Sequence, residues 1–284
     1  MVRCDAITVQ KLPVEANLEL GPEGYWRSNR AQDISYPSEG NDLCFAVEDG
    51  SFWFQHRNRC IVETVRRNPP AGAIFDIGGG NGCVSRALLD AGFDSVVVEP
   101  GPSGARNAVA RGVPNVICST LEDAGFSPRS IPAMGLFDVI EHIADDAGFL
   151  ASLNRYLLPG GKIYLTVPAY QSLWSQEDVL AGHCRRYSLQ QLLDVVRSAG
   201  FEVNYCSGIF RFLIAPIFLA RVLPYRLGWR RQLRPENVKA DHQPANGLGA
   251  ALLKRLCGSE VAKIQSGRSQ QTGATWLLTA TLCK

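Results

Sequence analysis

A cluster of glycines directly after a short apolar run has the composition of a ligand-binding turn. The segment from Phe75 to Gly82 reads FDIGGGNG, so glycines stand at positions 78, 79, 80 and 82. Glycine permits a sharp turn with positive φ and lets a ligand approach the main chain. The N-terminus of a following helix would favour a carboxylate or a phosphate. The dinucleotide pattern G-x-G-x-x-G needs a third glycine where Cys83 or Ser85 stands, so this segment does not match it.

A single acid indicates what kind of ligand this turn would hold. Glu99 closes the next expected strand, and Pro100 follows it. A carboxylate at a strand end can accept hydrogen bonds from both ribose hydroxyls of a nucleoside lying over the sheet. Nicotinamide enzymes use the same arrangement, so Glu99 indicates a nucleoside without saying which one. The alternative is a surface acid at a strand end.

Two histidines near later strand ends could act as a base toward a substrate hydroxyl. His142 lies in the segment Leu136 to Ile143 (LFDVIEHI), and His183 opens the segment HCRRY. Each histidine could instead form only local hydrogen bonds. Trp174 and the residues Arg185, Arg186 and Tyr187 accompany His183 and could bind a polar or anionic acceptor, or the arginines could brace the helix that begins at Ser188.

The elements that must position these residues alternate between strands and helices. Valine- and isoleucine-rich runs separated by helices of about ten residues predict an α/β fold with a doubly wound, mostly parallel, seven-stranded sheet. Such a sheet binds ligands at the carboxyl ends of its strands. The expected strands are 73–77, 95–99, 116–118, 131–137, 162–167, 201–206 and 275–283, the expected helices are 51–67, 83–91, 103–111, 147–157 and 188–199, and Leu158-Pro-Gly-Gly is expected to be a turn.

Composition changes along the chain predict three parts. Residues 1–50 are expected to be an irregular arm that could hold one hairpin and act as a lid, and 51–208 with 270–284 form the main domain. Residues 209–269 are an apolar or helical insertion before the last strand. Within it, Ile209 to Trp229 is too interrupted by arginines and prolines to span a membrane. It could pack as core, cover the acceptor pocket as a lid, or make a peripheral membrane contact.

Bulk properties exclude several classes of protein. The chain has 284 residues with 29 basic and 27 acidic side chains, which is too balanced to predict a nucleic-acid partner. Its 9 cysteines are scattered without C-x-x-C spacing, which predicts neither a zinc site nor a disulfide framework and favours the cytoplasm. The amino terminus lacks the pattern of a signal peptide.

The glycine segment resembles the first motif of class I S-adenosylmethionine-dependent methyltransferases, in which an acid precedes G-x-G-x-G by two residues. The segment around Asp138 to His142 resembles the D-V-x-E-H segment of small-molecule methyltransferases, including the O-methyltransferases of the ubiquinone pathway. The segment Leu158 to Lys162 (LPGGK), before the fifth expected strand, also resembles the methyltransferase family. The resemblance implies S-adenosyl-L-methionine as cofactor, S-adenosyl-L-homocysteine as product, and a small-molecule acceptor. The methylated atom is expected to be an oxygen, in a sugar, lipid-linked or secondary-metabolite hydroxyl.

The resemblance also implies roles for individual residues. Thr120 and Leu121 would meet the adenine ring, and Arg57 would bind the methionine carboxylate, unless it is an ordinary surface arginine. The cofactor-binding residues are then Arg57, Asp76, Gly78, Gly79, Gly80, Gly82, Glu99, Pro100, Thr120, Leu121, Phe137, Asp138 and Val139. The catalytic residues are His142 and His183, and the acceptor pocket is formed by Phe52, Trp53, Trp174, Arg185, Arg186 and Tyr187.

Ubiquinone-pathway relatives have an E-x-x-E-H pattern thought to hold a divalent ion. Asp138, Glu141 and His142 keep those ligand types with a shorter first acid, and no metal is expected here. Two alternative functions stay open. A nicotinamide-dependent oxidoreductase would leave the D-V-I-E-H segment unexplained, whereas a non-catalytic protein that binds S-adenosylmethionine is separated from an enzyme only by an acceptor assay.

Overall fold

A computed structural model describes residues 18–28, 38–229 and 248–283 of the chain. The strands are β1 (Leu18–Leu20), β2 (Trp26–Ser28), β3 (Ile74–Ile77), β4 (Ser95–Val98), β5 (Val116–Cys118), β6 (Ile131–Phe137), β7 (Leu157–Pro168), β8 (Phe201–Ile209) and β9 (Thr275–Leu282). The α-helices are α1 (Ser38–Glu48), α2 (Phe52–Arg67), α3 (Cys83–Asp90), α4 (Pro102–Ala110), α5 (Leu121–Ala124), α6 (Asp146–Ser152), α7 (Gln176–Ala181), α8 (Leu189–Ser198), α9 (Ile214–Ile217), α10 (Leu223–Arg226) and α12 (Leu248–Gln265). Short 3-10 turns are η1 (Ile140–His142), η2 (Leu153–Arg155), η3 (Gln171–Leu173) and η4 (Arg211–Leu213), and η5 (Phe218–Val222) is a π-helical turn.

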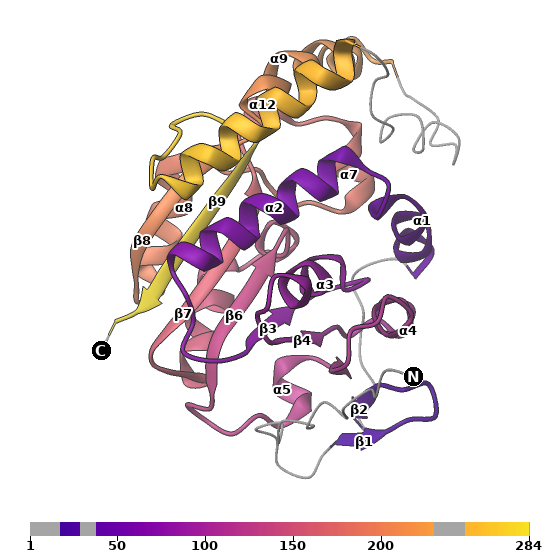
Figure 1. Ribbon diagram of the computed structural model, residues 1–284, viewed down its shortest axis with the longest axis vertical. Helices are drawn as coiled ribbons and strands as arrows, with labels where there is room; N and C mark the ends of the chain where they lie inside the picture. The colour runs from indigo at the N-terminus through magenta and orange to yellow at the C-terminus, as the bar shows by residue number, and fades with distance from the viewer. Residues whose placement is uncertain (1–17, 29–37, 230–247, 284) are drawn as a thin grey trace, which may run out of the picture.

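The described strands form a single sheet in the order β1-β2-β5-β4-β3-β6-β7-β9-β8 (Figure 1). The pairs from β2 to β7 along this order are parallel, whereas β1 and β9 run antiparallel to their neighbours. The predicted α/β class, with a doubly wound and mostly parallel sheet, is confirmed.

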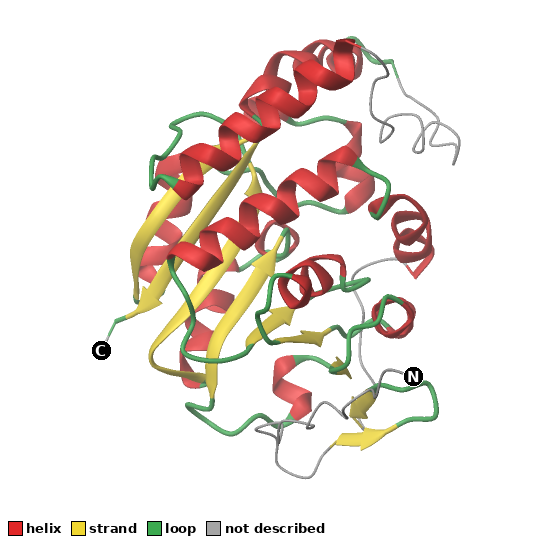
Figure 2. Cartoon of the chain, in the orientation of Figure 1, coloured by secondary structure: helices red, strands yellow, loops and turns green. Residues whose placement is uncertain are grey.

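Helices cover both faces of the sheet (Figure 2), and each face has its own hydrophobic core. On one face α5, α6 and α8 bury residues such as Leu150 and Leu192. On the other face α2, α3 and α12 bury residues such as Ile61, Leu88 and Ile264. Every residue of β3 and β4 is buried, as expected for strands with apolar layers on both sides.

The sheet has nine strands instead of the predicted seven because part of the N-terminal arm joins its edge. β1 and β2 form a hairpin, and Trp26 and Arg27 pair with Ile117 and Cys118 of β5. α1 also lies within the arm. The hairpin is the one that the sequence allowed for in the arm, whereas its pairing with β5 and the helix α1 were not predicted. Residues 1–17 and 29–37 lie outside the described part of the chain.

Two predicted boundaries in the middle of the chain also differ. Leu158-Pro-Gly-Gly does not separate a helix from a strand, because it lies inside β7. The pairing of β7 with β6 shifts register between Ile131 and Ala133, and such an irregularity accommodates the additional residues. The helix expected over 147–157 is shorter, ending at Ser152 and continuing only as the turn η2.

The insertion before the last strand is helical over its described residues, apart from the end of β8. η4, α9, η5 and α10 follow one another closely, and α12 lies along α2 (Figure 1). Val222 and Ile264 are buried, so the insertion contributes to the core. Among residues 18–28, 38–229 and 248–283, no helix combines the length and apolar character needed to cross a membrane.

Candidate active site

The carboxyl ends of β3 and β6 meet where the strand order reverses. β4 and β5 lie beyond β3 on one side, and β7 lies beyond β6 on the other. In open parallel sheets this reversal leaves a crevice in which ligands bind. The glycine loop begins directly after β3, and Asp138 follows β6, so the two strongest sequence motifs meet here.

The glycine loop turns through the left-handed region of the backbone. Positive φ occurs at Gly78 (66°), Gly80 (49°) and Gly82 (70°). The carbonyl oxygen of Gly79 accepts a hydrogen bond from the N–H of Gly82 at 2.9 Å. A Cβ atom on Gly82 would lie 2.9 Å from Cβ of Ala108 and 3.0 Å from Cγ2 of Val113. Glycine at 82 is therefore required by packing against these neighbours as well as by its φ.

Asp76 lies beneath the loop, where it contacts the first turn of α3. Its Oδ2 accepts a hydrogen bond from Oγ of Ser85 at 2.7 Å, and Ser95 donates in turn to Ser85 at 2.9 Å. Asp76 is only 1% exposed. Burial raises its pKa to about 6, although the bond from Ser85 and the charge of Arg57 act in the opposite direction. The position suits a residue that shapes the loop.

Glu99 connects the glycine loop to the loop after β4. Its Oε2 accepts a hydrogen bond from the N–H of Gly80 at 2.9 Å, and its Oε1 accepts one from the N–H of Gly101 at 2.7 Å. Burial raises the pKa of the carboxyl, and these two N–H groups oppose that shift. Pro100 follows, half-buried, at the same strand end.

Arg57 reaches from α2 to the end of β6, where its Nη1 donates to Oδ2 of Asp138. The guanidinium also lies over the ring of Phe54, with its carbon 5.1 Å from the ring centre. Asp138 has a φ of 58° and accepts a second hydrogen bond from Oγ1 of Thr166 at 2.9 Å. The structure thus gives Arg57 a carboxylate partner within the chain, while its buried Nε has no hydrogen-bond partner among the described residues.

The N-terminal helix α1 is attached to the glycine loop by a buried ion pair. Nη1 of Arg111 lies 2.8 Å from Oε2 of Glu48, and the same Nη1 donates to the carbonyl oxygen of Asn81 at 2.6 Å. The Arg111 and Glu48 side chains are 5% and 9% exposed. No sequence motif indicated this contact, because its three residues come from separate elements.

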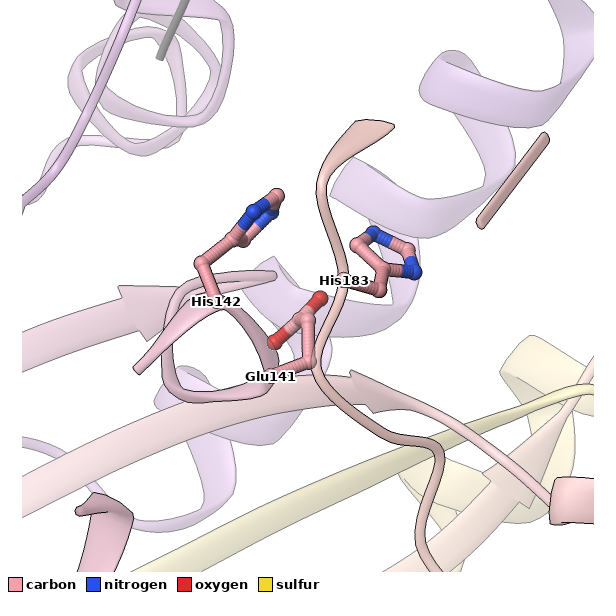
Figure 3. Close-up of side chains that lie close together, drawn as sticks. All are labelled: Glu141, His142 and His183. Atoms are coloured by element: carbon pink, nitrogen blue, oxygen red, sulfur yellow. The ribbon is translucent and has the colours of Figure 1, made fainter. Parts of the chain in front are cut away.

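Glu141, His142 and His183 form a compact group beyond the end of β6 (Figure 3). One potential ligand atom from each side chain lies within 4.8 Å of the others. The two imidazole rings stand edge to face with centres 4.8 Å apart. Nδ1 of His183 lies 2.8 Å from Oδ1 of Asp178, which fixes that ring. The two predicted catalytic histidines are thus adjacent.

The comparisons with known proteins agree on a family. The model of the "Methyltransferase domain" family matches residues 52–205, which is more than half of the chain. The chain belongs to this family. A probable S-adenosylmethionine-dependent methyltransferase of Mycolicibacterium smegmatis is 22% identical over 186 residues, which are 64% of this chain and 72% of the relative. The protein is a class I S-adenosylmethionine-dependent methyltransferase.

Solved structures confirm the fold of the methyltransferase. An S-adenosylmethionine-dependent methyltransferase from Thermotoga maritima, described as a possible histamine N-methyltransferase, is 19% identical with a TM-score of 0.51, over 86% of this chain and 95% of its own. Phosphoethanolamine N-methyltransferase 2 of Haemonchus contortus, in complex with S-adenosyl-L-methionine, is 18% identical with a TM-score of 0.53. The match covers 88% of this chain and 58% of the Haemonchus chain.

S-adenosyl-L-methionine is the cofactor of the methyltransferase, and S-adenosyl-L-homocysteine is its product. The residues at the crevice fit this cofactor. Glu99 offers buried carboxylate oxygens at the end of β4, and the Nε of Arg57 is a buried cationic donor without a partner. The individual contacts of these two residues with the cofactor stay predictions.

Four predicted cofactor contacts, two of them predicted to meet the adenine ring, have structural roles in the fold. Oγ1 of Thr120 caps α5 by accepting from the N–H of Asp123 at 3.2 Å. Leu121 is 3% exposed within the core and Phe137 is 7% exposed, so both offer little surface to a ligand. Val139 packs close to Gly78, where a Cβ atom would lie 3.2 Å from its Cγ2.

Several predicted acceptor-pocket residues are occupied by internal contacts. Nη1 of Arg185 lies 2.6 Å from Oδ2 of Asp146, and Nε of Arg186 lies 2.7 Å from Oδ1 of Asp178. Tyr187 is 2% exposed and donates its hydroxyl to Asp146 at 2.6 Å. The placement of Tyr187 in a pocket is therefore wrong, because its ring lies in the core. The two arginines brace α6 and α7, which favours the structural alternative for them, although the partners are not those of α8.

The aromatic residues of α2 lie against the insertion. The ring of Trp53 stacks on that of Phe210 at 3.8 Å between centres with an angle of 4° between the planes. Phe52 and Trp174 are half-buried. Glu260 of α12 closes this region, because its carboxylate accepts from the N–H of Phe210 at 2.8 Å and lies 2.9 Å from Nε2 of His56. His56 and Glu260 carried no signal in the sequence, since they are 204 positions apart.

Proposed function

We propose that the methyltransferase transfers its methyl group to an oxygen atom of a small molecule, and that His142 and His183 act on the proton of that hydroxyl. The observation that carries this proposal is the hydrogen bond of 2.8 Å between Asp178 and Nδ1 of His183. A base that is oriented by a carboxylate is the usual arrangement for activating a hydroxyl. His142 lies against the same ring.

The cofactor supplies a methyl group that its sulfonium has already activated. The residues of the chain therefore have to align the acceptor, exclude water and remove one proton. Alignment alone accounts for about 7–11 kcal/mol in favourable intramolecular reactions. Glu99 contacts the glycine loop after β3, and Arg57 contacts Asp138 at the end of β6, where His142 follows in the same segment.

The surroundings of the two histidines suit the removal of a proton from a hydroxyl. Burial lowers the pKa of His142, and the neighbouring His183 lowers it further. His142 is therefore neutral at pH 7 and able to accept a proton. Burial acts to raise the pKa of Asp178, but hydrogen bonds from His183 and Arg186 bring it to about 2, so this carboxylate stays ionised.

The test compares variants of both histidines in an assay that measures S-adenosylhomocysteine release with a panel of hydroxyl, amine and carboxyl acceptors. His183→Ala and His142→Ala should lower turnover at least ~100-fold for the accepted hydroxyl compounds. Both should bind S-adenosylhomocysteine as tightly as the unaltered chain. Methylation of amines alone, or full activity of both variants, contradicts the proposal. No turnover with any acceptor despite cofactor binding favours the non-catalytic alternative.

The insertion suggests a second proposal, a peripheral contact with a membrane surface. Its apolar side chains are unusually exposed: Leu219 at 62%, Leu223 at 39%, Leu227 at 62% and Trp229 at 70%. Arg221 and Arg226 stand among them, a composition suited to an anionic lipid surface. The full chain should co-sediment with anionic vesicles but not with neutral ones, and Leu227→Glu with Trp229→Glu should abolish it. Lack of co-sedimentation leaves the insertion as core and pocket cover only.

A further inference from the structure

The carboxyl group of Glu141 is buried and has no described partner apart from its own backbone N–H. Glu141 is 0% exposed, and neither side-chain oxygen is hydrogen-bonded to another residue of the described chain. A buried carboxylate is strongly unfavourable unless it carries a proton, pairs with a cation or binds a metal. Arg57 and Arg186 are nearby cations, but each contacts another carboxylate instead.

Each of the two histidines beside Glu141 forms a hydrogen bond that orients its ring. Nδ1 of His183 is bound to the carboxylate of Asp178, which leaves Nε2 for another ligand. His142 forms a hydrogen bond with the backbone of Gly182. Histidines that bind metals commonly use their second nitrogen in this way, toward a carboxylate or a backbone carbonyl, because that bond fixes the orientation of the ring.

We infer that Glu141, His142 and His183 bind a divalent cation of the zinc type. Two imidazoles and one carboxylate are a known ligand set for zinc sites that keep a further position open for water or substrate, and nitrogen ligands favour such cations over magnesium or calcium. No metal was expected from the sequence, because the shorter Asp138 stands where the pattern of the ubiquinone-pathway enzymes has its first Glu. The structure places Asp138 on Arg57 and Thr166, and brings His183 to the group instead.

The group must contract to hold a zinc ion. In a tetrahedral site with bonds of about 2.0–2.2 Å, two ligand atoms lie roughly 3.4 Å apart. In the structure the three ligand atoms lie within 4.8 Å of one another. Binding therefore requires these side chains to move closer to a shared ion.

Cation binding does not depend on the proposed function, but the role of the cation rests on it. A bound divalent cation lowers the pKa of a coordinated hydroxyl, which then loses its proton to solvent near neutral pH. The freed oxygen lone pair forms the new carbon–oxygen bond, and the sulfur–carbon bond electrons return to sulfur as the neutral thioether. The two imidazoles then act on the hydroxyl proton through the ion that they bind, and not by accepting the proton themselves.

The test is calorimetric titration of the full chain with zinc ions after removal of metals by a chelator. We expect one ion for each chain, and Glu141→Gln and His183→Ala should each weaken the affinity at least ~10-fold. Glu202→Gln is the matched control, because it makes the same chemical change at an exposed carboxylate and should bind as the unaltered chain does. Cobalt(II) added in place of zinc should give the visible absorption of a low-coordinate site, and Glu141→Gln should remove it.

Three results would overturn the inference. They are the absence of heat with zinc, equal affinity in Glu141→Gln and Glu202→Gln, and loss of binding in Cys184→Ser, which would assign the ion to the exposed thiol next to His183. Thermal melting of each variant, together with titration by S-adenosylhomocysteine, verifies that the variants are folded.

If zinc binds but no hydroxyl acceptor is methylated, this inference stands and the proposed function fails. If hydroxyl methylation survives chelation while zinc does not bind, the reverse holds.

Discussion

The cofactor side of the crevice and its proposed acceptor side are built in different ways. On the cofactor side, Gly78 to Gly82 and Glu99 contact one another through backbone N–H groups close in sequence. On the acceptor side, Glu141, Asp178 and His183 come from separate segments and are held by side chains. Residue type at each position determines the backbone conformation of the glycine loop. The group of Glu141, Asp178 and His183 depends instead on contacts between separate elements. Substitutions should therefore act locally in the glycine loop and spread across elements on the acceptor side.

The largest effect is expected from Gly82→Ala on the cofactor side. A positive φ costs an alanine about 1–2 kcal/mol, and the collision with Ala108 and Val113 adds about 1–3 kcal/mol. Gly92→Ala is the matched control, because Gly92 has a φ of 87° and no atom within 4 Å of the added Cβ. Urea denaturation should show a loss about 2 kcal/mol larger in Gly82→Ala. Equal losses in the two variants would mean that only backbone conformation matters at 82.

The cofactor side should also respond to pH through Asp76. Its folded pKa of about 6 lies above the ordinary 3.8, so the folded chain holds a proton that the unfolded chain has lost. The free energy of unfolding should therefore fall as the pH rises from about 4 to about 6, by up to roughly 3 kcal/mol. Asp76→Asn should remove this slope in urea denaturation measured at several pH values. An unchanged slope would place its origin in another group.

In the insertion, Glu260→Gln should destabilise the contact between α12 and Phe210 with Arg211. Its two oxygens accept from the N–H groups of Phe210 and Arg211 at 2.8 and 2.9 Å, and an amide can present an acceptor to only one of them. We expect a loss of about 2 kcal/mol in urea denaturation. Glu202→Gln, at an exposed carboxylate, should be neutral. If the free energy of cofactor binding falls as much as the free energy of unfolding, the insertion and the cofactor side are coupled and are not built independently.

The sequence predicts the cofactor side better than the proposed acceptor side, for physical reasons. The sheet, its helices and the glycine loop follow from local periodicity and from residue types that few conformations accept, so they were predictable. Arg185, Arg186 and Tyr187 were placed in a pocket because they are polar or aromatic and follow a strand. Their partners, Asp146 and Asp178, lie on other elements, and no pattern along the chain specifies such pairs. A hairpin in the arm was predictable, but its place at the edge of the sheet was not, because β2 pairs with β5, which lies about 90 residues further along the chain.

The smallest effect is expected from Glu99→Ala. It tests the connection that Glu99 makes between the glycine loop and the loop after β4. Since its carboxylate accepts from Gly80 and Gly101, it has a structural task besides the predicted contact with ribose. Glu99→Ala should weaken S-adenosylhomocysteine binding by about 1–2 kcal/mol in calorimetry. The analogue that lacks the 2′-hydroxyl separates the two tasks. If Glu99 binds ribose, the analogue loses affinity against the unaltered chain but little against Glu99→Ala, because the contact is already absent there. Equal losses against both proteins would leave Glu99 as a residue that holds the loop alone.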